Sequence, residues 1–175
     1  MTRHGVKDAT TDPAQIRAWA RQFPGCNWAI ACGPPGPMVL DVDPRNGGDE
    51  SLDELTARFG RLPETLTVQT GGGGAHYYLA LAEGMTGAAS KLGTGLDWQG
   101  VGKYVVIPPS LHASGARYRW ISPRGTPLAV VPWWLAELAE RPALPVEAPT
   151  IPRDAGDVEK RGRAYLATMP ASVSG

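Results

Sequence analysis

Apolar side chains recur at helical spacing near the start of the chain and predict a helix at residues 12–23. Its apolar stripe consists of Ile16, Trp19, Ala20 and Phe23. Asp12 can cap this helix, Pro13 suits its first position, and Gln15 completes a capping box. We therefore expect a helix with one buried face.

The same spacing predicts two further helices, at residues 49–60 and at residues 132–141. The inward positions of the first are Leu52, Leu55 and Phe59. Gly60 favours the end of that helix, and Pro132 suits the start of the second.

Short apolar runs between turn residues predict strands. They lie at residues 26–33, 38–43, 65–70, 75–81, 103–110 and 116–121. Four glycines, residues 71–74, separate the third run from the fourth, so we expect a hairpin whose loop lets a ligand approach closely. The resulting order, α-β-β-α-β-β-β-β-α, predicts an α+β domain at residues 1–141.

The end of the chain differs from this domain in composition. Residues 142–155 hold four prolines and are expected to form a linker. Residues 156–175 have the pattern of a C-terminal helical segment that is cut short.

Composition narrows the class of protein. Hydrophobic residues make up 42% of the chain, which is typical of a globular protein. No apolar run approaches the roughly 18 residues of a membrane span, and the polar start lacks a signal-peptide core, so we expect no membrane and a cytoplasmic location. The net charge of 0 argues against binding duplex DNA over the whole surface. Cys26 and Cys32 suit neither a disulfide framework nor a zinc site.

The run MVLDVD at residues 38–43 places two carboxylates within an apolar strand. Buried carboxylates are costly unless a partner or a metal compensates them. Because strand residues alternate between faces, Asp41 and Asp43 share one face while Leu40 and Val42 point into the core. Carboxylates at this spacing can jointly hold two Mg²⁺ ions for phosphoryl chemistry. Asp43 equally suits the start of a turn, since DPRNGG is turn sequence.

Further polar residues are candidates for a phosphate or metal site. His76 follows the four glycines at the mouth of the predicted hairpin, where a backbone N–H such as that of Gly74 could meet an anion. Asp97, between glycines in GLDWQG, can supply a third carboxylate, or it can serve only as the cap of a turn. The remaining candidates for phosphate contact are Lys103, Ser110 and His112.

Arg117 and Arg119 lie two residues apart on a predicted strand and therefore share one face, with Tyr118 and Trp120 on the other. This pattern is compatible with single-stranded DNA running over a sheet. It is equally typical of an exposed edge strand.

Seven segments carry a resemblance to a known family when taken in order. They are KDATTD, NWAIACG, VLDVD, GGDESL, LPETLTVQTGGGGAHYYL, GLDWQG and GKYVVIPPSLHASGARYRW. From Lys7 to Trp134 the chain resembles the bifunctional DNA primase/polymerase (Prim-Pol) domain of the archaeo-eukaryotic primase superfamily. The resemblance implies an α/β N-terminal module packed beside an RRM-like, mostly antiparallel sheet, with the active site in the cleft between them.

The resemblance also implies roles for the matching residues. Asp41 and Asp43 match the DxD motif, His76 matches the histidine motif, and Asp97 matches the acidic motif. By the resemblance, the three aspartates bind two Mg²⁺ or Mn²⁺ ions, and His76 contacts the triphosphate of an NTP or dNTP. Many relatives have serine where this chain has Gly74. Two lone cysteines exclude the cysteine-rich zinc stem of some relatives.

The implied activity is template-directed nucleotidyl transfer from a primer on single-stranded DNA, in replication of a plasmid, phage or prophage. The implied setting is a bacterial or phage-infected cell. Relatives often have a helix and strand before KDATTD, and often continue into a helical module and a helicase. Because that helical segment is cut short here, we expect primer extension rather than initiation.

Two other classes of function use the same residues. A two-metal nuclease or phosphoesterase would release nucleotides from DNA with the same carboxylates. A non-catalytic, primase-like module would bind DNA or nucleotides without turnover, and its nucleotide affinity would hardly respond to metal removal.

Overall fold

The computed structural model describes residues 3–140 of the 175-residue chain. The helices are α1 (Pro13–Gln22), α2 (Gly48–Phe59) and α3 (Trp133–Glu140), with short 3-10 turns η1 (Gly5–Asp8) and η2 (Pro44–Asn46). The strands are β1 (Trp28–Ala31), β2 (Met38–Val42), β3 (Thr67–Gln69), β4 (Ala75–Ala80), β5 (Ser90–Gly93), β6 (Leu96–Gln99), β7 (Tyr104–Ile107), β8 (Arg119–Trp120) and β9 (Ala129–Val130). The predicted linker at 142–155 and the predicted helical segment at 156–175 lie outside the described residues.

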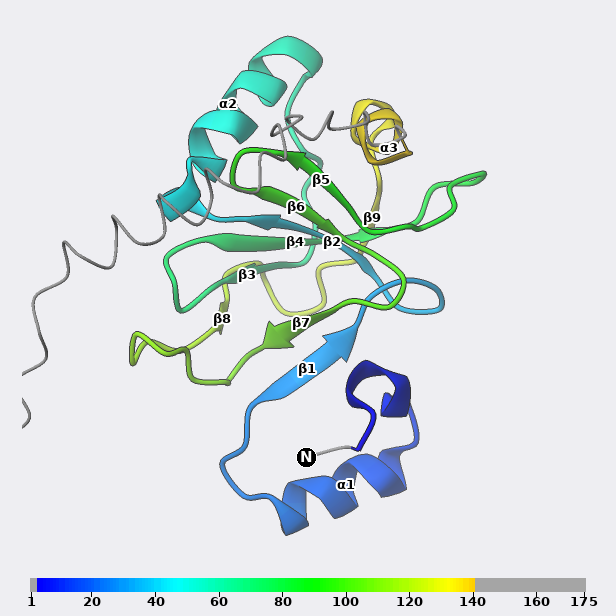
Figure 1. Cartoon of the computed structure of the whole chain (residues 1–175), viewed down its shortest axis with the longest axis vertical. Coiled ribbons are helices and arrows are strands. Elements are labelled where there is room, and N and C mark those ends of the chain that lie inside the picture. The colour runs from blue at the N-terminus through cyan, green and yellow to red at the C-terminus, as the bar shows by residue number, and fades with distance from the viewer. Residues whose placement is uncertain (1–2, 141–175) are drawn as a thin grey trace, which may run out of the picture. The chain divides into compact units, whose positions relative to one another are not determined.

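The strands of residues 3–140 form two sheets (Figure 1). The larger sheet has the order β5-β6-β2-β4-β3-β8, and β9 runs parallel to β4. Every other strand pair is antiparallel, including β1 with β7 in the smaller sheet. The predicted α+β class, with a mostly antiparallel sheet, is confirmed. The predicted RRM-like packing beside a separate N-terminal module stays a prediction.

One face of the larger sheet packs against α2 and α3 (Figure 1). The strands contribute Met38, Leu40, Val42, Leu79, Leu96 and Trp98 to this core. Helix α3 adds Trp134 and Leu135, and the predicted inward residues of α2 pack against the same cluster. The ring of Phe59 stacks on that of Trp134 with their centroids 6.1 Å apart. The part of this face that β2, β4 and β6 form is therefore committed to packing.

The opposite face of the larger sheet packs against the smaller sheet over part of its area. Val39, Val68 and Tyr78 meet Cys32 and Val105 in a second buried cluster. Strand β2 is central to both cores, because its residues are buried alternately on either side. Only Asp41 among the five residues of β2 is not buried.

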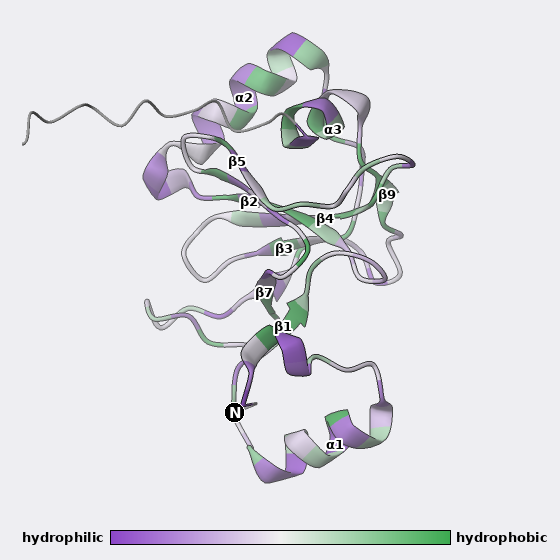
Figure 2. Cartoon of the chain, turned by 45° about the vertical axis from the view of Figure 1, so that its right-hand side comes forward, coloured by the Kyte–Doolittle hydropathy of each residue, from purple (hydrophilic) through white to green (hydrophobic). Residues whose placement is uncertain are grey.

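The predicted burial of the first helix is wrong. Asp12 caps α1, and its side chain accepts a hydrogen bond from the backbone N–H of Ala14. No residue of α1 is buried, however, and Ile16 remains 36% exposed. Figure 2 shows hydrophilic and hydrophobic residues mixed along this helix. Apolar spacing predicts that a helix forms, but it carries no information about which surface will cover the stripe.

Three strands, β5, β6 and β9, were not predicted from the sequence. Strand β5 ends and β6 begins within GTGLD, a glycine-containing run that is typical of a loop, and β9 has only two residues. Strand β6 nevertheless alternates, with Leu96 and Trp98 buried and Asp97 on the other face. The strand predicted at 116–121 is restricted to β8, whose two residues are both exposed.

We predict that Leu79→Ala lowers the free energy of unfolding by about 2–5 kcal/mol, because Leu79 is fully buried between the sheet and its helices. Urea unfolding followed by circular dichroism measures this change. Val130→Ala on the neighbouring strand is the matched control, since Val130 is 61% exposed and its change should stay within about 0.5 kcal/mol. Equal effects of the two substitutions would contradict the position of this core.

Candidate functional site

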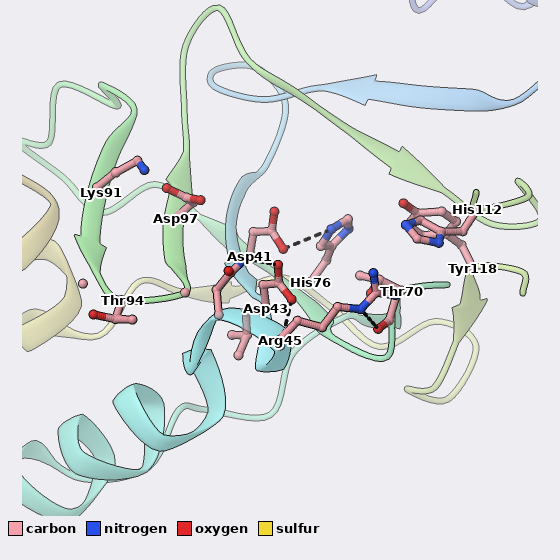
Figure 3. Close-up of a pocket in the computed structure, with 15 residues that line it drawn as sticks. Asp41, Asp43, Arg45, Thr70, His76, Lys91, Thr94, Asp97, His112 and Tyr118 are labelled. Atoms are coloured by element: carbon pink, nitrogen blue, oxygen red, sulfur yellow. Dashed lines mark hydrogen bonds and ion pairs between the residues drawn. The ribbon is translucent and has the colours of Figure 1, made fainter. Parts of the chain in front are cut away.

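A row of cross-strand neighbours crosses the larger sheet at Asp41. Asp41 lies opposite Asp97 of β6 on one side and opposite His76 of β4 on the other. The row continues to Lys91 beyond Asp97, and to Val68 and Trp120 beyond His76. Cross-strand neighbours point to the same face of a sheet. Residues that are far apart in the sequence are therefore gathered on one face (Figure 3).

This row borders a cleft of about 510 Å³, a volume typical of small-molecule sites. The acidic residues that line it are Asp41, Asp43 and Asp97. The basic residues that line it are Arg45, Lys91, His76 and His112. Figure 3 shows Lys91 and Asp97 on one side of Asp41, with His112 and Tyr118 on the other side. The cleft thus has carboxylates at its centre and cationic or hydrogen-bond-donating groups at both ends.

His76 is more deeply placed than expected from the sequence. Its exposed fraction is 5%, because β4 is an interior strand and the residue opposite on β3 is the buried Val68. The ring nitrogen Nε2 lies 3.5 Å from Oδ1 of Asp41. The other nitrogen, Nδ1, is buried without a hydrogen-bond partner among the described residues. His76 therefore reaches the cleft only through the edge of its ring that faces Asp41.

Asp43 combines the two roles that its sequence context allows. Its Oδ1 accepts a hydrogen bond of 3.1 Å from the backbone N–H of Arg45, and its Oδ2 accepts one of 2.7 Å from the side chain of Asn46. Asp43 is thus the cap of η2 while it also lines the cleft. Its backbone N–H donates to the carbonyl of Gly95, which ties the end of β2 to the start of β6.

The carboxylates lack cationic partners of their own. Asp41 and Asp97 lie directly opposite each other, an arrangement of like charges that destabilises a sheet. Within residues 3–140, no lysine or arginine forms an ion pair with Asp41, Asp43 or Asp97. An arrangement of this kind is stabilised when a cation binds between the two charges.

The donor set fits a hard divalent cation in its chemistry, because carboxylate oxygens are the ligands that Mg²⁺ and Mn²⁺ prefer. As the side chains stand, no three acidic, histidine or cysteine residues within 3–140 are gathered closely enough to hold one ion. Asp41 is turned toward His76 and Asp43 is engaged as a cap (Figure 3). The metal assignment therefore stays a proposal.

Hydrogen-bond donors are held at the end of the cleft beyond His76. Nε of Arg45 donates to the carbonyl of Gly72 at 3.1 Å, which leaves the terminal nitrogens of the guanidinium for an anion. Nδ1 of His112 is held by Ser114, because it lies 3.0 Å from both the backbone N–H and the hydroxyl of that residue. Burial and the nearby charge of Asp41 raise the pKa of the Tyr118 hydroxyl, so this group stays protonated.

A comparison with known protein families identifies the family of this chain. The family described as bifunctional DNA primase/polymerase, N-terminal (Prim-Pol) matches residues 1–134. The chain belongs to the Prim-Pol family. Membership supports a nucleotidyltransferase of the DNA primase/polymerase type, with nucleotides and DNA as substrates, in a family that generally uses divalent metals. A comparison with curated proteins found no match. Among the helices within 3–140, none has the length and apolar character needed to cross a membrane.

Five residues of the predicted Prim-Pol site do not line the cleft: Gly74, Lys103, Ser110, Arg117 and Arg119. Ser110 is 3% exposed, and its hydroxyl bonds the backbone of Trp28 to join β1 and β7. Arg117 donates to the carbonyl of Pro109. The N–H of Gly74 donates to the hydroxyl of Thr70, so it is not available to an anion.

Arg45 and Lys91 line the cleft but were not predicted. Arg45 stands in a turn sequence that gives no sign of the cleft, although it follows Asp43 by two residues. Lys91 lies on a strand that the sequence pattern did not reveal. Pairing with β6 is what places Lys91 beside Asp97. If Asp97 is recognised as a strand residue, the strand before it in the sequence becomes a candidate neighbour, and Lys91 could have been found there.

The glycine loop shapes the cleft by allowing close packing at Gly71 and Gly74. A Cβ atom at Gly71 would collide with Cβ of His112, and one at Gly74 would collide with the carbonyl oxygen of Val42. The hydroxyl of Ser114 donates to the carbonyl of Gly71 at 2.7 Å, which joins the two loops. Because glycine has no side chain, the loop can pack directly against β2 and against His112.

Burial raises the pKa of the Cys32 thiol to about 12, with a smaller contribution from the charge of Asp41. Cys32 is therefore an uncharged core residue and not a nucleophile.

We predict that Gly74→Ala lowers the free energy of unfolding by about 1–3 kcal/mol, because the added methyl group must displace the end of β2. Gly93→Ala is the matched control, since a Cβ atom there meets nothing within 4 Å. Its effect should stay within about 0.5 kcal/mol. Thermal and urea unfolding of both variants measure the difference, and equal stability of the two would refute the close contact.

Proposed function

We propose that this Prim-Pol domain catalyses template-directed nucleotidyl transfer, adding an NTP or dNTP to the 3′-hydroxyl of a primer on a single-stranded DNA template. The observation that carries this proposal is the cross-strand pair of Asp41 and Asp97, which forms no ion pair with a lysine or arginine among the described residues, in a polar cleft that also contains Asp43. Paired carboxylates that face solvent in this way are typical of phosphoryl-transfer sites.

Asp41, Asp43 and Asp97 are the residues that would hold the metal ions. Bound Mg²⁺ or Mn²⁺ would lower the pKa of the primer hydroxyl and neutralise the leaving phosphates. The imidazole of His76 orients the carboxylate of Asp41 across 3.5 Å. The buried core beneath β2, β4 and β6 keeps the three strands in register, so the backbone positions of Asp41 and Asp97 are fixed and only their side chains would have to turn to share an ion.

The other end of the cleft suits the triphosphate. Arg45 presents the free part of its guanidinium, Tyr118 presents a neutral hydroxyl, and His112 lines the same end with its Nδ1 held by Ser114. His76 adds the edge of its ring beside Asp41. Donors in this number recognise a charged, oxygen-rich group. We therefore place the β- and γ-phosphates at this end.

The chemical step balances without a further reactant. A bond forms between the primer O3′ and the α-phosphorus, and the bond from the α-phosphorus to the oxygen that bridges to the β-phosphate breaks. Pyrophosphate leaves with the electron pair of that bond, and the hydroxyl proton passes to solvent. The protein contributes position and charge, which is the usual basis of phosphoryl-transfer catalysis.

We predict that Asp41→Asn combined with Asp97→Asn reduces primer extension by at least about a hundredfold, because both central negative charges are removed. The measurement is extension of a labelled primer on a longer template with dNTPs and Mg²⁺ or Mn²⁺. Calorimetric titration with Mn²⁺ should show weaker binding to the same variant. Asp53→Asn, an exposed carboxylate on α2 outside the cleft, is the matched control and should retain activity.

The same experiment separates the alternatives. Shortening of the primer by the unmodified protein would favour a two-metal nuclease. Nucleotide binding that persists in EDTA, without extension or shortening, would favour a non-catalytic module. Extension that survives loss of both carboxylates would overturn the proposed site.

We predict that Arg45→Ala raises the nucleotide KM by roughly tenfold and leaves the primer KM within about twofold, because one charge-assisted contact to phosphate is lost. Steady-state extension at varied dNTP and varied primer measures the two constants. Arg124→Ala, an exposed arginine outside the cleft, should change neither. A change in primer KM alone would place Arg45 on the DNA rather than on the nucleotide.

A further inference from the structure

Lys91 is the one residue of the cross-strand row that supplies a lysine to the cleft. It lies on β5, at the edge of the larger sheet, directly opposite Asp97. Its side chain is exposed, lines the cleft and lies beside Asp97 (Figure 3). Among residues 3–140 its ammonium group has neither an ion pair nor a hydrogen bond. Lys91 is therefore a positive charge that is available to an anion in the cleft.

The backbone of β5 aims this side chain. The pairing of β5 with β6 shifts register between Lys91 and Gly93, which leaves Leu92 as an extra residue in the strand. Leu92 packs against the hydrophobic core, while Lys91 stays on the cleft face opposite Asp97. A bulge of this kind commonly re-aims a side chain next to an active site.

A lysine on an edge strand also has a structural explanation. Charges on an edge strand hinder pairing with a second chain. That role requires only an exposed charge, however, and does not require the side chain to line the cleft. Lys91 lines the cleft without an ion pair among the described residues, so its charge would attract an anionic ligand once metal ions neutralise the neighbouring carboxylates.

The order of residues in the row indicates which anion this is. In nucleotidyl transfer the attacking and leaving oxygens lie on opposite sides of the α-phosphorus. The residues proposed for the leaving phosphates, Arg45 and His112, lie beyond Asp41 on the His76 side. The primer 3′-hydroxyl must then approach from the Asp97 side, which is where Lys91 lies.

We propose that Lys91 binds the phosphate next to the 3′-terminal nucleotide of the primer, so the β5 end of the cleft is the primer side. This inference rests on the proposed function, because it takes its direction from the nucleotidyl-transfer reaction. Lys91 is a positioning residue: it holds the primer end and does not touch the reacting atoms.

The test pairs a protein substitution with a change in the primer. Binding of a fluorescent primer–template is measured by anisotropy without nucleotide, using a normal primer or one whose 3′-terminal linkage is a neutral methylphosphonate. The unmodified protein should bind the neutral primer roughly five- to tenfold more weakly, because one charged contact is lost. Lys91→Ala should bind both primers with the same, weakened affinity. Its salt dependence should fall by roughly 0.7–0.9 in the slope of log affinity against log salt.

Two further variants control for folding and for general charge. Lys91→Arg keeps the charge and should retain most of the affinity and its sensitivity to the neutral linkage. Lys7→Ala removes an exposed lysine outside the cleft and should behave like the unmodified protein with both primers. In extension assays, Lys91→Ala should raise the primer KM and leave the nucleotide KM unchanged, the reverse of Arg45→Ala.

Each result decides the inference. A rise in nucleotide KM with unchanged primer binding would place Lys91 on the triphosphate and overturn it. Continued sensitivity of Lys91→Ala to the neutral linkage would overturn it as well, leaving the edge-strand explanation. Failure of the unmodified protein to extend any primer would instead refute the proposed function. The binding measurements with the normal and the neutral primer would then still report whether Lys91 contacts that phosphate.

Discussion

Hydrophobic packing on one side of β2 and β6 holds two carboxylates opposite each other on the other side, against their mutual repulsion. Asp41 and Asp97 lie opposite each other on the cleft face, while Leu40, Leu96 and Trp98 are buried beneath them. Burying large apolar side chains yields more free energy than a partly solvated pair of like charges costs. The core therefore keeps the charges together, and the cleft, its donors and its proposed chemistry all depend on that packing.

The loops around the cleft are joined to this frame by short polar contacts. Ser114 links its own loop to Gly71, and Arg45 links η2 to Gly72. Asp43 links the end of β2 to η2 through its side chain and to β6 through its backbone. None of these contacts is deeply buried, so each contributes modestly to stability. Their effect is to orient donors that come from separate parts of the chain.

Much of this arrangement could be predicted from the sequence where the pattern is local. Alternation along residues 38–43 correctly placed Leu40 and Val42 in the core and Asp41 on the opposite face. The four glycines correctly predicted the hairpin of β3 and β4. That Asp41, His76 and Asp97 form one site could be predicted only from the resemblance to a family, because no local pattern specifies which strands pair. For the same reason Lys91 was missed, and the depth of His76 was underestimated.

Other residues were predicted to be buried or to line the site, but the fold places them elsewhere. The stripe on α1 has the spacing of a buried face, yet Ile16 stays exposed, because burial depends on a second surface. Lys103 and Ser110 lie close in sequence to cleft residues, but β7 carries them to the smaller sheet instead. Proximity along the chain was a poor guide once the strands belonged to different sheets.

The register of β6 against β2 has a consequence for how this domain can vary in length. Strand residues alternate strictly between faces, so a shift by one residue turns every side chain of the strand over. Such a shift in β6 would carry Asp97 into the core and bring Trp98 into the cleft. The protein would then lose both its hydrophobic core and the carboxylate of the cleft, so it would not fold with a merely altered cleft. Insertions and deletions are therefore expected only in exposed parts of the connecting segments, such as residues 83–84 between β4 and β5, where the site would keep its residues in place.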